Sequence, residues 1–303
     1  MDESVAATGE AAPLAVRALP RPAAGGGRPA AVAMVLAAAT SLQVGAAFAV
    51  TLFDDLGPGG AAFLRLLLAA AVLLAVWRPR LRGHSAADLR TAAAFGVALG
   101  LMNWSIYEAM HRIPLGVAVT IEFWGPLAVA VLGSRRALDL LWVALAGCGI
   151  VLLAGPGGGT VDPAGVALAL LAGGCWVAYI GLSARTGRAF PGGTGLAIAM
   201  AVGALVVLPA GLAQGGAALL QPGLLASGLV VALASSVVPY SLELEALRRL
   251  PGAVFGVLMS LEPAVAALAG LAVLGQSLVA REWFAIGLVV TASAGAAALG
   301  ARR

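Results

Sequence analysis

The chain has 303 residues, of which 61% are hydrophobic and only 11% are charged, and its formal net charge is +4. Soluble domains carry about 25% charged residues, so this composition excludes a soluble globular protein and predicts that lipid is the solvent. The two cysteines, Cys148 and Cys175, lie inside apolar runs, which excludes a secreted disulfide framework.

The first 29 residues contain four prolines and a run of three glycines, and they lack apolar periodicity. This composition predicts a disordered, mildly basic tail over residues 1–29. The apolar run that follows, residues 30–52, is longer than the ~7–15-residue core of a signal peptide, so we interpret it as the first membrane span.

Apolar segments then follow one another to the C-terminus, separated by short links rich in proline, glycine or arginine. Each is about 18–25 residues long, enough to cross a ~30 Å hydrocarbon core. The predicted fold is therefore an all-α polytopic membrane protein with ten transmembrane helices. The predicted segments are 30–52, 60–77, 90–110, 114–133, 138–155, 163–184, 194–212, 222–247, 251–274 and 282–301.

Arginine supplies all 18 basic residues, and its placement tests this count. With the N-terminus in the cytoplasm, 15 arginines fall on the cytoplasmic side, Arg112 and Arg281 fall outside, and Arg65 lies within a span. Cytoplasmic loops carry an excess of Lys and Arg in membrane proteins. The pattern predicts a multi-pass protein of the cytoplasmic membrane with both termini in the cytoplasm.

The chain contains an internal repeat. Residues 108–114 read Glu-Ala-Met-His-Arg-Ile-Pro, and residues 245–251, 137 positions later, read Glu-Ala-Leu-Arg-Arg-Leu-Pro. The same offset aligns Pro126 with Pro263. We therefore predict two modules, over residues 30–155 and 156–303.

Each predicted module holds five spans, an odd number, so the second copy should enter the membrane upside down relative to the first. Inverted repeats of this kind are common in secondary transporters, which hold substrate near the midplane between the copies.

Charged residues inside spans are candidate site residues, because an ionised side chain at mid-bilayer costs about 2.5–3.5 kcal/mol on insertion scales. Arg65 is the first, and it either extends to the surface, pairs with a glutamate, or binds a substrate carboxylate. On the third segment, Asn103 and Tyr107 are four residues apart on one helix face. They either bind a polar solute or belong to an interfacial aromatic belt.

Glu122 lies near the middle of the fourth segment, in Ile121-Glu-Phe-Trp-Gly-Pro126. Pro126 has no N–H, so the carbonyl of residue 122 loses its helical donor. Gly125 leaves room for another group to approach. Such interrupted helices are tolerated in membranes where they line a cavity. The alternative is a structural glutamate paired with a neighbouring helix.

The second copy carries Glu262 directly before Pro263, but Gly125 and not Glu122 aligns with Glu262, so the site should be asymmetric. Glu243 and Glu245 lie near the cytoplasmic end of the eighth segment, beside arginines. Interfacial salt bridges explain Glu245, whereas a site role for Glu243 stays open.

Motifs for enzymatic and nucleic-acid chemistry are missing from the sequence. No Walker motif is present, so we expect no direct use of ATP. His84 and His111 have no ligand partner at a useful spacing, so we expect no metal and no cofactor.

The ten spans and the proline-centred fourth and ninth helices resemble the EamA-type branch of the drug/metabolite transporter superfamily. The resemblance is most specific in Ile113–Ala130, Ser134–Arg136, Pro239–Glu243 and Gly256–Pro263, stretches similar to those of bacterial threonine/homoserine exporters. One departure is Leu274-Gly-Gln276, where family members often carry Leu-Gly-Glu. The resemblance implies export of threonine, homoserine or related small amino acids.

We therefore expect a secondary exporter that works by alternating access, with an amino acid, a proton or other coupling ion, and the lipid bilayer as its partners. Glu122 would bind the substrate ammonium or the proton, and Arg65 would attract the carboxylate or keep Glu122 ionised. No nucleic-acid partner is expected, and a homodimer is left open. Three alternatives remain, namely another cargo on the same fold, a lipid-modifying membrane enzyme, and a structural or sensor role.

Overall fold

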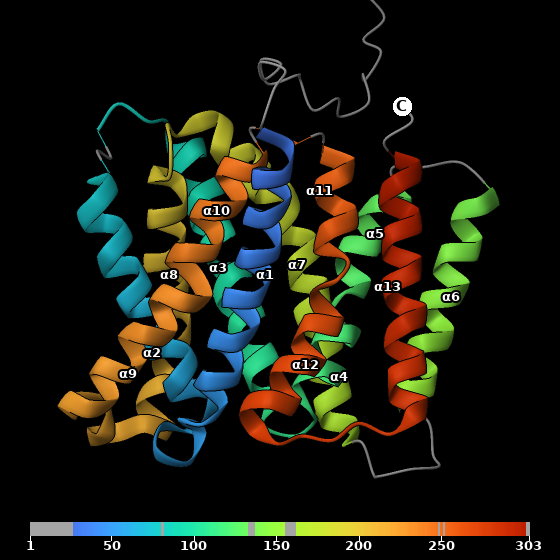
Figure 1. The fold of residues 1–303 in the computed structure, drawn as a ribbon. Coiled ribbons are helices and arrows are strands. Elements are labelled where there is room, and N and C mark those ends of the chain that lie inside the picture. The colour runs from blue at the N-terminus through green and yellow to red at the C-terminus, as the bar shows by residue number, and fades with distance from the viewer. Residues whose placement is uncertain are drawn as a thin grey trace, which may run out of the picture.

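A computed structural model of the chain describes residues 27–79, 82–132, 137–154, 162–247, 249–250 and 252–300. These residues form helices joined by short turns, with no strand among them (Figure 1). Most of the predicted N-terminal tail and the link at 155–159 lie outside the described residues. The elements are α1 (Gly27–Val50), α2 (Phe53–Trp77), α3 (Ala86–Met110), α4 (Leu115–Glu122), α5 (Trp124–Leu132), α6 (Ala137–Ala154), α7 (Pro163–Ala189), α8 (Thr194–Gly215), η1 (Gly216–Leu220), α9 (Pro222–Ala232), η2 (Leu233–Val237), α10 (Val238–Leu247), α11 (Gly252–Met259), α12 (Glu262–Leu274) and α13 (Ala280–Gly300).

The all-helical prediction is confirmed, and several helices have the length and apolarity of membrane spans. Within the described residues, six stretches are long and apolar enough to cross a bilayer, and 115–129 and 140–153 form shorter apolar helices. Neither α3 nor α13 is among those six. The count of ten spans therefore stays a prediction.

Each of the two proline-centred segments consists of two helices separated by a short interruption. α4 ends at Glu122 and α5 begins at Trp124, while α11 ends at Met259 and α12 begins at Glu262. α4 and α11 each have 8 residues, and their bounds differ by the offset of the sequence repeat. α4 begins at the lower end of the bundle in Figure 1 and α11 at the upper end, so the two segments run in opposite directions. This arrangement supports an inverted duplication.

Arginines gather at one end of the bundle. α1 begins, α2 ends, α3 begins, α7 ends and α13 ends at the upper end in Figure 1. Arg78 and Arg82 flank the α2–α3 turn, and Arg185 and Arg188 lie near the end of α7. We name this upper end of the bundle the arginine-rich end.

Two features of the helices differ from expectation. The loop expected between the first two segments, Asp54–Gly60, belongs to α2, which is kinked at Gly57 with φ 65°. The predicted eighth span, 222–247, has the outer bounds of α9 and α10 but contains a π-helical turn, η2, between them. Both departures depend on contacts with distant residues, since the Gly59 N–H next to the kink donates to Gln214 Oε1 at 2.6 Å.

The start of α3 is stabilised by local capping hydrogen bonds. Ser85 Oγ accepts from the Asp88 N–H at 3.1 Å, and Asp88 Oδ2 accepts from the Ser85 N–H at 3.1 Å, forming a capping box at the start of α3. The Ser85 hydroxyl also donates to Asp88 Oδ2 at 2.7 Å, and this hydrogen bond, together with that from the Ser85 N–H, lowers the pKa of the exposed Asp88 carboxyl. Such a cap satisfies two of the helix's unpaired N–H groups.

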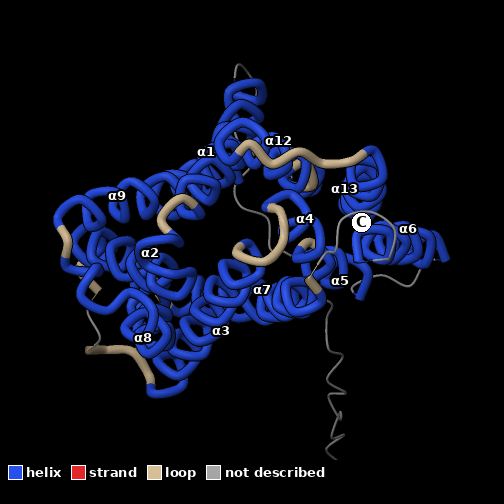
Figure 2. Tube along the Cα trace, turned by 90° about the horizontal axis from the view of Figure 1, so that it is seen from below, coloured by secondary structure: helices blue, strands red, loops and turns tan. Residues whose placement is uncertain are grey.

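The middle of the bundle is packed through close helix contacts. A Cβ at Gly96 would lie 2.7 Å from the Ala199 carbonyl oxygen, and one at Gly100 would lie 2.8 Å from that of Gly203. Small residues let membrane helices approach this closely. Figure 2 shows α6 and α13 at one edge of the bundle and α8 and α9 at the other, with α1, α2, α3, α4 and α7 between them.

The predicted inverted duplication can be tested through membrane sidedness. Arg112 follows α3 and Arg249 follows α10, and these positions are equivalent in the repeat. Single cysteines introduced at positions 112 and 249 should react with a membrane-impermeant maleimide from opposite faces of right-side-out and inverted vesicles. Labelling of both from the same face would contradict the inverted arrangement.

Candidate functional site

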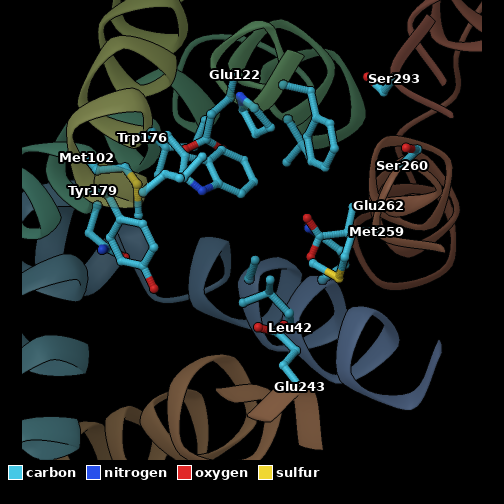
Figure 3. Close-up of a pocket in the computed structure, with 18 of the residues that line it drawn as sticks. Leu42, Met102, Glu122, Trp176, Tyr179, Glu243, Met259, Ser260, Glu262 and Ser293 are labelled. Atoms are coloured by element: carbon cyan, nitrogen blue, oxygen red, sulfur yellow. The ribbon is translucent and has the colours of Figure 1, made fainter. Parts of the chain in front are cut away.

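A cavity of about 520 Å³ lies among the helices, inside the ~300–1,000 Å³ range of small-molecule sites. Its lining is mostly apolar, and residues of both predicted modules contribute to it. Figure 3 shows Glu122, Glu262 and Glu243 on three sides of this cavity. The polar and charged side chains that line it are Gln43, Arg65, Asn103, Glu122, Trp176, Tyr179, Ser183, Tyr240, Glu243, Ser260, Glu262 and Ser293.

The residues that line the cavity near the arginine-rich end are more exposed than those near the other end. Ser183, Glu243 and Phe255 lie near that end and are half-buried. Met110, at the last turn of α3, and Val119 in α4 line the opposite end and are buried. At that opposite end α4 packs against α12, where a Cβ at Gly116 would lie 2.6 Å from Ala267 Cα.

Arg65 is buried, with 5% of its surface exposed, and it lines the cavity from α2. It donates to Ser235 O at 2.8 Å, Ser236 Oγ at 3.1 Å and Tyr107 Oη at 3.2 Å. The two serines belong to η2, and Pro239 of α10 has no N–H, so the Ser235 carbonyl lacks its helical donor and can accept from the guanidinium. Arg65 thus neither extends to the surface nor hydrogen-bonds to a carboxylate among the described residues.

Glu122 is the last residue of α4 and lies at the interruption of this segment, with 7% of its surface exposed. The chain turns at Phe123, whose N–H donates to the Val119 carbonyl at 3.1 Å. Pro126, in the first turn of α5, also lines the cavity. Figure 3 shows the Glu122 carboxylate beside Trp176 of α7.

Glu262 lies at the start of α12 and is almost completely buried, with 1% of its surface exposed. Its Oε1 is buried and has no hydrogen-bond partner among the described residues. Pro263 follows it in the first turn of α12 and does not line the cavity. Glu243 is half-buried and faces the cavity from α10, while Glu245 pairs with Arg249, whose Nε lies 2.9 Å from its Oε1.

Asn103 and Tyr107, the two residues predicted to share a face of α3, have different surroundings. Asn103 lines the cavity and donates from Nδ2 to the Leu99 carbonyl at 2.9 Å. Tyr107 is fully buried and does not line the cavity, and its hydroxyl accepts from Arg65. Neither residue therefore belongs to an interfacial belt, and Tyr107 can reach a solute only through Arg65.

Several cavity residues were not singled out in the sequence. Trp176 and Tyr179 face the cavity from α7, and Tyr240 faces it from α10. Gln43 of α1 is buried, and its Oε1 has no hydrogen-bond partner among the described residues. A neutral amide inside an apolar run was the available signal for Gln43, because an amide is also costly to bury in hydrocarbon.

Glu108, near the end of the third predicted segment, was not among the candidate site residues. It is buried, with 5% of its surface exposed. It accepts from Arg112 Nη1 at 2.7 Å and from Gln214 Nε2 at 2.8 Å. Because Gln214 also accepts from the Gly59 N–H, this network joins α2, α3 and α8 at the end of the bundle opposite the arginine-rich end.

Gly125 does not open space for a ligand. A Cβ there would collide with the carbonyl oxygen of Gly173 in α7, so the glycine allows α5 and α7 to touch. A Cβ at Gly173 would in turn lie 2.6 Å from the Glu122 carbonyl oxygen and would also collide with Trp124. This contact fixes the position of the interruption that carries Glu122.

Two adjacent glycines test this packing. We expect Gly173→Ala to lower the melting temperature of the detergent-solubilised protein, since overpacking costs about 1–3 kcal/mol. The Gly174→Ala variant is the matched control, because the nearest atom to a Cβ at Gly174 is 3.6 Å away. Equal melting temperatures of the two variants would show that the α5–α7 contact does not hold the interruption in place.

The cavity combines one guanidinium with carboxylates in a mostly apolar space, and this arrangement suits a small solute that carries both charge signs. Across the part of the chain that the structure describes, no group of three or more His, Cys, Asp and Glu side chains could hold a metal ion.

A model of the EamA-like transporter family matches residues 163–297. The threonine/homoserine exporter RhtA of Escherichia coli (strain K12) is 43% identical over 268 residues, covering 87% of this chain and 90% of RhtA. RhtA of Salmonella typhimurium (strain LT2) is 42% identical, with the same coverage.

A solved structure described as "Crystal structure of protein" aligns with 91% of this chain and 99% of its own, with a TM-score of 0.56 and 21% sequence identity. That similarity concerns the fold alone.

Proposed function

Because the chain belongs to the EamA-like transporter family, and is therefore a multi-pass membrane transporter, we propose that it exports small neutral amino acids of the threonine/homoserine type. The relatives named for this activity cover nearly the whole chain. The site of action is the cavity lined by Arg65, Glu122, Glu243 and Glu262.

The observation that carries this proposal is the pairing of opposite charges in one buried, mostly apolar cavity. An amino acid at neutral pH has one ammonium and one carboxylate. A site for it needs a group of each sign, because leaving either charge unpaired away from water is costly. Among the described residues, the hydrogen-bond partners of Arg65 are all neutral, so its charge is available to a substrate carboxylate.

Glu122 is the proposed partner of the substrate ammonium. It lies at the interruption between α4 and α5 beside Trp176 (Figure 3). Broken helices hold the substrate in several transporter folds, since the freed backbone groups and the side chains at the break face the cavity. Apolar lining residues such as Met102 and Ile106 would contact the aliphatic side chain.

Alternating access is the proposed mechanism, with the cytoplasmic membrane as the location and both termini in the cytoplasm. The opposite directions of the two interrupted segments (Figure 1) support it. In this arrangement the described state, open toward the arginine-rich end, faces inward. A proton gradient is the proposed energy source, because buried carboxylates are common proton carriers in transporters.

The test is flux in vesicles that contain only this protein. Purified protein is reconstituted, vesicles are loaded with radiolabelled threonine or homoserine, and release is followed with and without a proton gradient. A panel of a purine, a cationic drug and glutamate provides the comparison. Release of threonine and homoserine that depends on the protein supports the proposal, and release of none of the amino acids would refute it.

One observation favours a second candidate, a cationic cargo on the same fold. Three carboxylates but one guanidinium line the cavity, so a ligand with excess positive charge would also be attracted. The cationic member of the panel distinguishes the two cargo classes, since it would outcompete threonine only if the second candidate is correct.

A further inference from the structure

The carboxyl of Glu262 has surroundings unlike those of the other acidic groups in the cavity. Its residue exposure is 1%, against 7% for Glu122, and Glu243 is only half-buried. Its Oε1 has no hydrogen-bond donor among the described residues. Figure 3 shows this side chain directed into the cavity from α12, beside Met259.

No cation next to Glu262 compensates its charge in the described residues. α1, α4 and α13 pack against α12. Facing the cavity, α1 presents the neutral Gln43 and α13 presents Ser293. The titratable and charged groups that share the cavity with Glu262 are Arg65 of α2, Glu122 of α4, Tyr179 of α7, and Tyr240 and Glu243 of α10.

The charges of the substrate leave this carboxyl without a partner. In the proposed binding mode the substrate carboxylate is matched by Arg65 and the ammonium by Glu122. An additional ionised carboxylate without a donor is costly away from water. The least costly state for such a group is the protonated acid, which carries no charge.

We propose that Glu262 carries the coupling proton, and that this role is separate from substrate binding by Arg65 and Glu122. This inference rests on the proposed export function. Glu262 takes one proton from the external solution when the cavity faces outward and releases it to the cytoplasm when the cavity faces inward. The amino acid moves in the opposite direction, so the inward proton flow drives export.

The position of Glu262 in the helix makes the release step feasible. It occupies the first turn of α12, and a helix N-terminus stabilises a negative charge. Burial disfavours the ionised form, while the helix terminus favours it. Both protonation states therefore stay accessible during a transport cycle.

The two predicted modules differ at the position of the proposed proton carrier, Glu262. The equivalent of Glu262 in the first module is Gly125, which contacts α7 and not the cavity. The two interrupted segments are thus equivalent in backbone but not in chemistry. We infer that the first module supplies the substrate contacts of Arg65 and Glu122, and the second module supplies the proton carrier.

The experiment separates coupling from binding in reconstituted vesicles. Two rates are measured, threonine–threonine exchange at equal pH and threonine accumulation driven by a pH gradient. We expect Glu262→Gln to lower gradient-driven accumulation at least tenfold while exchange continues and no longer depends on pH. Glu262→Asp should restore coupling, and Glu245→Gln, a change at a carboxylate outside the cavity, should leave both rates as in the native protein.

Three results would overturn the assignment. One is gradient-driven accumulation by Glu262→Gln at the native rate. Another is loss of exchange in a folded Glu262→Gln protein, which would place Glu262 in substrate binding. The third is accumulation driven by a sodium gradient in place of a pH gradient. Absence of any threonine flux in the native protein would instead refute the export function itself.

A measurement on the native chain covers the case in which Glu262→Gln does not fold. Dicyclohexylcarbodiimide reacts with protonated carboxyls in apolar surroundings, and peptide mass spectrometry locates the adduct. We expect modification at Glu262 that decreases as the pH rises. Modification of other cavity carboxyls without Glu262 would contradict the proposal.

Discussion

Glu122→Gln is expected to abolish export of threonine and homoserine while leaving insertion into the membrane intact. The amide keeps the size and the hydrogen-bonding capacity of the side chain but removes the charge that matches the substrate ammonium. Removing one member of a buried charge pair costs about 2–5 kcal/mol, which corresponds to a loss of affinity of about 30-fold to several thousand-fold.

The measurement for Glu122→Gln combines binding and flux. Threonine binding to purified protein is followed by calorimetry, and efflux is followed in vesicles with matched amounts of folded protein. Glu245→Gln is the control, because it makes the same chemical change at a carboxylate that pairs with Arg249 outside the cavity. Export by Glu122→Gln at the native rate would remove this residue from the site.

Replacing Arg65 should have the second large effect, and for two separable reasons. Arg65→Gln removes the proposed partner of the substrate carboxylate. It also leaves the Ser235 carbonyl, Ser236 Oγ and Tyr107 Oη without the donor they share. A buried polar group without a partner costs about 1–3 kcal/mol, so we expect lower thermal stability as well as loss of transport.

Two further variants separate these contributions. Arg65→Lys retains a positive charge but cannot reproduce the planar fork of the guanidinium, so we expect weak binding and slow export. Tyr107→Phe removes one hydrogen bond and keeps the guanidinium, so it should retain most transport. Equal loss in Tyr107→Phe and Arg65→Gln would mean that the hydrogen bond between Arg65 and Tyr107, and not a contact between Arg65 and substrate, explains the effect of Arg65.

The sequence predicted those features of the fold that depend on local chemistry or composition. A proline removes a helical donor wherever it occurs, so the interruptions near Pro126 and Pro263 were visible from the chain alone. The repeat placed the two interruptions in register, and α4 and α11 have the bounds that this register requires. The energetic cost of charge in lipid singled out Arg65, Glu122 and Glu262, all of which line the cavity.

Features that depend on tertiary contacts were not predicted. The sequence of η2, Leu-Ala-Ser-Ser-Val, gives no signal for a π-helical turn, which is defined by the backbone hydrogen bond from the Val238 N–H to the Leu233 carbonyl. Its contacts with Arg65 of α2, through the Ser235 carbonyl and Ser236 Oγ, join residues about 170 positions apart. Glu108 lies near the end of a predicted segment, and nothing in its local sequence shows that Gln214, 106 positions along the chain, donates a hydrogen bond to it. Sequence spacing does not show which distant residues meet.

Gln276 makes a tertiary contact that the sequence also did not predict. Its Oε1 accepts the Leu115 N–H at 3.0 Å and so caps α4 from the other predicted module. A glutamine is therefore an adequate acceptor where family members often carry glutamate. The contact closes the end of the cavity opposite the arginine-rich end, where α4 meets α12.

Alternating access between the two predicted modules is the central claim, and a reversible cross-link at this closed end tests it most directly. An ideal Cβ at Gly270 of α12 would lie 3.5 Å from the Cβ of Leu115 in α4, within the ~3.5–4.5 Å range of disulfides. The double variant Leu115→Cys and Gly270→Cys is made with Cys148 and Cys175 replaced by alanine.

In vesicles, the cross-linked protein is predicted to be trapped open toward the arginine-rich end and to transport no threonine, and dithiothreitol should restore flux. Both single-cysteine variants should transport under oxidising and reducing conditions alike. Transport at an unchanged rate by fully cross-linked protein would contradict alternating access, because this end of the cavity would then never need to open.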